Sequence, residues 1–199
     1  MLGFYIGKCT CIVKFSFLAL VAFCCIYSGV GIGFSCFLAT LLHEGSHLLA
    51  MQFFGVLPEK AELSIMGCRV EIGGYSQLND KQQSLISLAG PCGNLLTALF
   101  VWAVGSYNSF VGINLAMCVA HSLPIEPLDG GLALHYILRS HFRKDKAEIV
   151  SRVLSSLFLL PLSVVGYYLL LQTKYNFSLL ALSLYLTAYL LFGKDYSQP

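Results

Sequence analysis

One five-residue stretch of the chain places two histidines around a glutamate. The sequence His43-Glu44-Gly45-Ser46-His47 has the spacing H-E-x-x-H, and residues four apart in a helix emerge from the same face. Two imidazoles on one face can hold one zinc ion, and the adjacent Glu44 can take a proton from a water molecule at that metal. The alternative is a hydrogen-bonded core cluster, but an apolar stretch offers no further partners to satisfy two histidines and a carboxylate. The spacing therefore predicts His43 and His47 as zinc ligands and Glu44 as general base.

A catalytic zinc site needs a third protein ligand and keeps its fourth position open. Residues 124–131 read P-I-E-P-L-D-G-G, and the prolines and glycines of this segment cannot continue a helix. Asp129 and Glu126 are its two candidate ligands. An aspartate before two glycines is also a common turn residue, which is the alternative interpretation of Asp129.

The composition indicates that these polar residues belong to a membrane protein. The 199 residues are 57% hydrophobic and only 11% charged, whereas soluble domains average about 45 to 50% and about 25%. The formal net charge of +2 is too small to favour nucleic acid as a partner. We therefore expect the chain to contact a lipid bilayer and to bind no nucleic acid.

Three apolar blocks predict six membrane spans. Residues 15–54, 82–123 and 153–193 contain no acidic or basic residue other than histidine, Glu44 and Lys174. Each block is about twice the 20 residues that cross a bilayer as a helix. Turn signals interrupt the blocks near their middles, at 28–33, 105–109 and 172–176. We expect an all-α polytopic membrane protein with six transmembrane helices in three hairpins, the last two spans contacting mainly lipid.

The distribution of positive charge predicts the orientation of these spans. Eleven of the twelve Lys and Arg residues fall in the N-terminal segment, the two long connections and the tail, and only Lys174 falls on the other side. Cytoplasmic loops carry the excess of such residues, so both termini should be cytoplasmic. His135 and His141 lie among the basic residues of the second connection, where we expect them at the surface.

The connection between the second and third spans carries a strand pattern. Residues 62–65 and 69–72 alternate polar and apolar side chains around Met66-Gly67-Cys68. This pattern predicts a small β-hairpin on the cytoplasmic side. Its edge would either pair with an extended substrate or form a structural ribbon.

With these motifs the sequence resembles the site-2 protease family of zinc intramembrane metalloproteases. The matching elements are H-E-x-x-H at 43–47, A-G-P-x-x-N at 89–94 and P-L-D-G-G at 127–131. The resemblance covers a core of about 15–139, and the C-terminal hairpin 153–193 matches only in hydropathy. It implies one metalloprotease domain over 1–199, with one zinc per chain held by His43, His47 and Asp129 and with Glu44 as catalytic base. The chain is most similar to the minimal sporulation-type branch, whose member in spore formers cleaves a membrane-associated sigma factor precursor.

One element departs from the family pattern. The family usually carries N-x-x-P-x-x-P before the D-G pair, and His121 occupies the asparagine position here. His121 is either a hydrogen-bonded residue at a helix end or a donor near the transition state. Asn94 either donates to the developing oxyanion and orients the substrate, or holds helices together. Gly90 and Gly93 should permit close helix packing.

The function predicted from these residues is zinc-dependent cleavage of a membrane protein in or next to its transmembrane segment. The expected partners are a membrane protein substrate, the lipid bilayer and a membrane-protein regulator. The alternative is a zinc carrier or other membrane zinc-binding protein that uses the same ligands without hydrolysis. A carrier needs a polar path across the membrane, and the sequence offers none beyond this cluster. A scaffold without activity would have no use for the Glu44 carboxylate.

Overall fold

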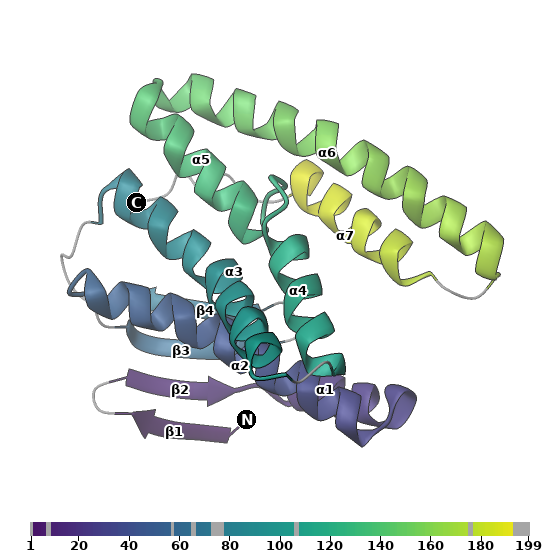
Figure 1. Cartoon of the computed structure of the whole chain (residues 1–199). Helices are drawn as coiled ribbons and strands as arrows, with labels where there is room; N and C mark the ends of the chain where they lie inside the picture. Colours follow the sequence, from purple (N-terminus) through teal and green to yellow (C-terminus); the bar gives the residue numbers. More distant parts are fainter. Residues whose placement is uncertain are drawn as a thin grey trace. The chain divides into compact units, whose positions relative to one another are not determined.

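The protein is described here from a computed structural model (Figure 1). The described residues are 2–6, 9–56, 58–64, 67–72, 78–105, 108–174 and 177–192, and they form seven helices and four strands. The chain divides into two compact units, Met1–Ala120 and His121–Pro199. Parts of three predicted turns lie outside the described residues, at 65–66, 106–107 and 175–176.

The first apolar block forms two helices that meet at one glycine. Helix α1 spans Phe15–Ser28 and α2 spans Val30–Phe53, and Gly29 between them has φ +88°, a conformation that suits glycine. The break is therefore shorter than the predicted turn at 28–33. Gly33 lets the helices approach closely, because a Cβ at this position would overlap the Cys25 side chain.

The second apolar block forms α3 (Asp80–Ala103) and α4 (Ser109–His121). Helix α3 begins with a capping box, in which the Asn79 side chain accepts from the Gln82 backbone N–H and the Gln82 side chain accepts from the Asn79 N–H. It packs along α2, and its buried positions on one side are small or polar: Ser84, Ser87, Gly90, Pro91, Asn94 and Ala98.

A four-stranded sheet belongs to the same unit, and it is larger than the small β-hairpin that was expected beside the helices. The predicted hairpin is present as β3 (Pro58–Ser64) and β4 (Gly67–Ile72), which pair antiparallel. The N-terminus adds β1 (Leu2–Ile6) and β2 (Cys9–Val13), and the sheet order is β1-β2-β3-β4. Strands β2 and β3 pair in parallel although about 50 residues separate them, with Thr10 opposite Lys60. The N-terminal segment was expected only as a cytoplasmic tail.

An ion cluster joins this sheet to the start of α1. The Glu62 carboxylate in β3 lies 2.7 Å from Nζ of Lys14, the residue before α1, and 2.7 Å from Nζ of Lys60. Hydrogen bonds from Lys14 and Lys60 lower the pKa of Glu62 from 4.5 to about 2.

The second unit contains α5 (Asp129–His141), α6 (Lys144–Thr173) and α7 (Ser178–Phe192). Helices α6 and α7 pack on one another and cover a loop that precedes α5. Ile125 of this loop is fully buried against Leu159 of α6 and Leu186 of α7. The last two helices therefore support the loop that carries Asp129, in addition to their expected contact with lipid.

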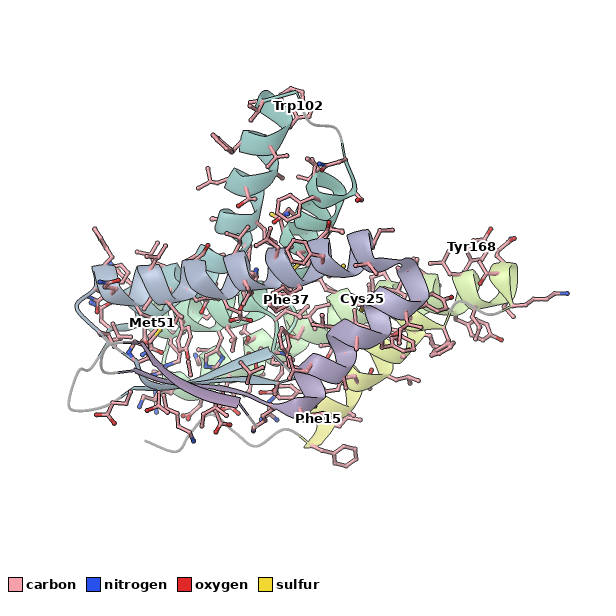
Figure 2. All side chains as sticks on the ribbon, turned by 90° about the horizontal axis from the view of Figure 1, so that it is seen from below. Phe15, Cys25, Phe37, Met51, Trp102 and Tyr168 are labelled. Atoms are coloured by element: carbon pink, nitrogen blue, oxygen red, sulfur yellow. The ribbon has the colours of Figure 1, made fainter. Side chains whose placement is uncertain are left out.

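Large apolar side chains remain exposed on most of the helices. Figure 2 shows Trp102 near the end of α3 and Tyr168 on α6 directed away from the ribbon, and these side chains are 53% and 57% exposed. By length and composition, two helices among the described residues could cross a membrane, α3 and α6. Helices α1, α4 and α7 are apolar but shorter.

Candidate active site

The two motif histidines lie together in α2. Their Nε2 atoms are 3.3 Å apart and their rings meet edge to face. His43 is almost fully buried, at 1% exposure, and Glu44 and His47 are partly buried. The predicted helical geometry of H-E-x-x-H is therefore present in this unit.

A contact from α3 selects the tautomer of His47. Its Nδ1 lies 2.7 Å from the carbonyl oxygen of Ile86, and a carbonyl can only accept, so Nδ1 carries the proton. When the ring is neutral, Nε2 carries a lone pair and faces Nε2 of His43. Histidine ligands of metals commonly have this arrangement, in which the second nitrogen donates to a backbone carbonyl.

Two glycines of the A-G-P-x-x-N motif allow α3 to approach these rings. A Cβ at Gly90 would overlap Nε2 of His47 and lie 2.7 Å from Nε2 of His43. A Cβ at Gly93 would overlap the Ser46 side chain. The expectation that both glycines permit close packing is confirmed, and the structure identifies the histidine pair as what Gly90 packs against.

Asn94, one turn beyond Gly90, is fully buried at 0% exposure. Neither its side-chain oxygen nor its nitrogen has a hydrogen-bond partner among the described residues. An unpaired buried amide costs about 1 to 3 kcal/mol, so this side chain needs a polar group that those residues do not supply.

The second unit holds Asp129 at the first position of α5. Nδ1 of His121, at the end of α4, lies 2.8 Å from Oδ2 of Asp129. An ionised carboxylate only accepts hydrogen bonds, so the imidazole Nδ1–H is the donor.

The two glycines after Asp129 allow the loop to fold onto the first turn of α5. A Cβ at Gly130 would overlap the Ser122 carbonyl, and a Cβ at Gly131 would overlap the backbone of Ile125 and Glu126. The loop is closed by a 2.8 Å hydrogen bond from the Leu128 N–H to the Ile125 carbonyl. The two glycines of the D-G-G sequence therefore have a packing reason, beside the predicted role of Asp129 as a ligand.

Glu126, the other candidate ligand, directs its carboxylate toward α5 and α6. Its Oε1 accepts a short hydrogen bond from Ser151 Oγ and lies 3.1 Å from Nδ1 of His135. His135 is 8% exposed, so its expected surface position is wrong, whereas His141 is exposed as expected. Ser151 and Ser155, which contact Glu126, were not predicted from the sequence. Their spacing of four in an apolar helix was the available signal, because it places two hydroxyls on one face.

The donor set in α2 fits a zinc ion. In a tetrahedral site with Zn–N distances of about 2.0 to 2.1 Å, two ligand nitrogens lie about 3.3 to 3.4 Å apart. The Nε2 atoms of His43 and His47 are 3.3 Å apart. The structure brings His43 together with His47, and His121 together with Asp129, whereas the approach of Asp129 to the histidines stays a prediction.

The comparison with solved structures bears on the fold. A site-2 protease from Methanocaldococcus jannaschii matches with a TM-score of 0.65 over 92% of this chain and 89% of that one, at 19% identity. Stage IV sporulation protein FB of Bacillus subtilis (strain 168) is 26% identical over 133 residues, or 63% of this chain. The resemblance to the site-2 protease family is confirmed. No model of a known protein family matches the sequence.

The site-2 protease fold places the three motifs on three separate elements. H-E-x-x-H lies in α2, A-G-P-x-x-N in α3, and the D-G-G element at the start of α5. The aligned part is 46% of the B. subtilis protein, so the chain spans about half the length of this curated relative.

Proposed function

We propose that the protein is a zinc-dependent intramembrane endopeptidase of the site-2 protease type, acting as one domain over residues 1–199. The observation that carries the proposal is the pair of imidazole nitrogens in α2, 3.3 Å apart with Glu44 beside them. A core cluster of histidines would not need a carboxylate at this position.

His43 and His47 hold the zinc through Nε2, with Asp129 as the third ligand. The hydrogen bond from His47 to the Ile86 carbonyl keeps that ring oriented. The contact between His121 and Asp129 orients the carboxylate in the same way. When bound, zinc supplies a Lewis acid that polarises the peptide carbonyl and lowers the pKa of water.

Glu44 moves the proton. As general base it takes a proton from the attacking water, and as general acid it gives this proton to the leaving amine nitrogen. The residue needs only to lie beside the ligands, and its position directly after His43 achieves this. Its partial burial limits competing water.

Asn94 is proposed to contact the substrate backbone near the scissile bond. Its buried amide has both a donor and an acceptor to offer, and hydrogen bonds to a substrate would satisfy them. His121 is proposed to act on Asp129, because a neutral ring that donates Nδ1–H to the carboxylate has no second N–H for a substrate carbonyl. In this proposal both residues belong to the active site, where Asn94 contacts the substrate and His121 orients Asp129.

The setting is proposed to be a bacterial inner membrane, crossed by six helices with both termini and the β3–β4 hairpin on the cytoplasmic side. Exposed apolar side chains such as Ile26, Phe100 and Leu160 support this setting, since soluble proteins rarely expose large contiguous apolar areas. The substrate would be a membrane-embedded or membrane-associated protein. The similarity to a sporulation protein supports a substrate in that process, such as a sigma factor precursor, with a membrane protein as regulator.

The test is to purify the protein in detergent, measure its zinc, and measure cleavage of tagged membrane proteins encoded beside its gene. We expect about one zinc per chain, most of it lost in His43→Ala and Asp129→Ala. Glu44→Gln keeps the shape and the ligands but removes the base, so it should bind zinc normally and lose cleavage. Cleavage by Glu44→Gln at the wild-type rate would refute the mechanism, and zinc movement across vesicles without cleavage would favour the carrier alternative.

A further inference from the structure

We propose that Glu126 is a positioning residue for Asp129, held by a buried clamp on α5 and α6; this inference rests on the proposed role of Asp129 as a zinc ligand. Glu126 lies three residues before Asp129 in the loop between α4 and α5. The Glu126 carboxylate holds the loop in place, and Asp129 at the end of the loop is the proposed zinc ligand.

The clamp has three contacts, all within the second unit. Oε1 of Glu126 accepts from Ser151 Oγ, and the Glu126 backbone N–H donates to Ser155 Oγ at 3.1 Å. Because Ser151 and Ser155 are one turn apart in α6, the two hydroxyls face the same residue. Nδ1 of His135 in α5 lies 3.1 Å from the same Oε1.

The burial of these side chains makes the contacts important. Glu126 and His135 are each 8% exposed, and both serines are fully buried. A buried carboxylate without partners is costly, so the chain keeps Glu126 only if its partners remain in place. Any movement that separates the carboxylate from these partners costs free energy, so the loop has one preferred position.

The arrangement of the clamp argues against a separate hydrolytic site. In a Ser-His-acid triad, the histidine lies between the serine and the acid. Here Ser151 bonds the carboxylate directly and is fully buried, so it is not available as a nucleophile. The cluster therefore serves the loop.

The backbone transmits this position to Asp129. A Cβ at Gly131 would overlap the Glu126 backbone nitrogen, so residue 126 touches the first turn of α5. The Leu128 N–H donates to the Ile125 carbonyl and closes the segment between them. A shift of Glu126 must therefore move Asp129, the first residue of that turn.

The first test measures zinc affinity by competition with a chromogenic chelator. Glu126→Ala should weaken zinc binding about 10- to 100-fold, the usual effect of losing a residue that orients a ligand. Glu126→Gln keeps an acceptor for the Ser151 hydroxyl and should restore most of the affinity. If Glu126→Gln loses zinc as completely as Asp129→Ala, Glu126 is itself a ligand and the positioning role is overturned.

Two buried serines, Ser151 in the clamp and Ser183 outside it, supply a test variant and its matched control. Ser151→Ala should weaken zinc binding in the same direction as Glu126→Ala, and combining the two should add little because they act through one contact. Ser183 in α7 is equally buried, but its hydroxyl donates to the Leu180 carbonyl of its own helix. Ser183→Ala should leave zinc affinity unchanged, and an equal loss in both serine variants would reduce the clamp to general packing.

Hydrogen exchange of the Leu132 amide tests, in the absence of zinc, whether the clamp holds the first turn of α5. This amide donates to the Leu128 carbonyl at 2.9 Å in the first turn of α5. Exchange should be faster in Glu126→Ala and Ser151→Ala than in wild type or Ser183→Ala, and equal rates would overturn the inference. If wild type binds no zinc, the proposed function fails while this measurement still decides the clamp. If wild type binds zinc and Glu126→Ala binds it equally well, only the clamp fails.

Discussion

Nδ1 of His121 lies 2.8 Å from Oδ2 of Asp129, where the end of α4 meets the start of α5. The family pattern usually has asparagine at position 121, and its side chain can donate one hydrogen bond in the same direction. This contact indicates that His121 orients the Asp129 carboxylate. A substitution of His121 should therefore affect zinc binding.

His121→Ala should weaken zinc binding about 10- to 100-fold, because Asp129 loses the donor that orients it. His121→Asn retains a donor and should keep substantial affinity and activity. Zinc competition and substrate cleavage measured on both variants test this prediction. Unchanged zinc affinity together with lost cleavage in His121→Ala would instead assign His121 to the substrate.

Gly90→Ala should remove most of the bound zinc although residue 90 lies outside H-E-x-x-H. The added methyl group would occupy the space of the His47 Nε2 atom and push the two rings apart. Zinc content after purification measures the effect, and thermal unfolding checks that the variant folds.

Gly45→Ala is the control for this substitution. It lies inside H-E-x-x-H, but a Cβ there meets no atom within 4 Å, and alanine favours a helix by about 1 kcal/mol over glycine. Zinc content should therefore remain normal in Gly45→Ala. A larger zinc loss in Gly45→Ala than in Gly90→Ala would contradict the packing argument.

The proposed orientation can be tested by cysteine labelling in a cysteine-free background. Single cysteines at Lys60 and Lys144 should be protected from an impermeant reagent added outside, and cysteines at Asn108 and Lys174 should react. The physical reason is the retention of Lys and Arg on the cytoplasmic side. External labelling at Lys144 would invert the topology.

The Glu62 cluster predicts an acid-dependent loss of stability. The pKa of Glu62 is lowered from 4.5 to about 2, so its ion pairs stabilise the fold fully above pH 4.5, and this contribution is lost as pH falls toward 2. The apparent melting temperature of wild type should exceed that of Glu62→Gln at pH 7, and the difference should shrink between pH 4.5 and 2. If the difference in melting temperature does not change with pH, the charge of Glu62 does not contribute to stability and the prediction is wrong.

The pairing of the two histidines in the candidate site could be predicted because its signal is local. Four residues along a helix return to the same face, so His43 and His47 meet whatever surrounds them. The three apolar blocks likewise predicted where α1–α2, α3–α4 and α6–α7 lie, and the Gly-rich or polar segments inside the blocks predicted where the helices break. The pairing of β3 with β4 was predictable because a short turn joins two alternating segments.

Other features depended on contacts between distant parts of the chain. The parallel pairing of β2 with β3 joins segments about 50 residues apart, and no periodicity in either strand specifies the partner. His135 lies among basic residues in the sequence, yet helix packing turns it inward to Glu126, which Ser151 reaches from 25 residues away. The spacing of residues determined which side chains share a face, whereas the packing of α5 and α6 decided which buried partner each of them meets.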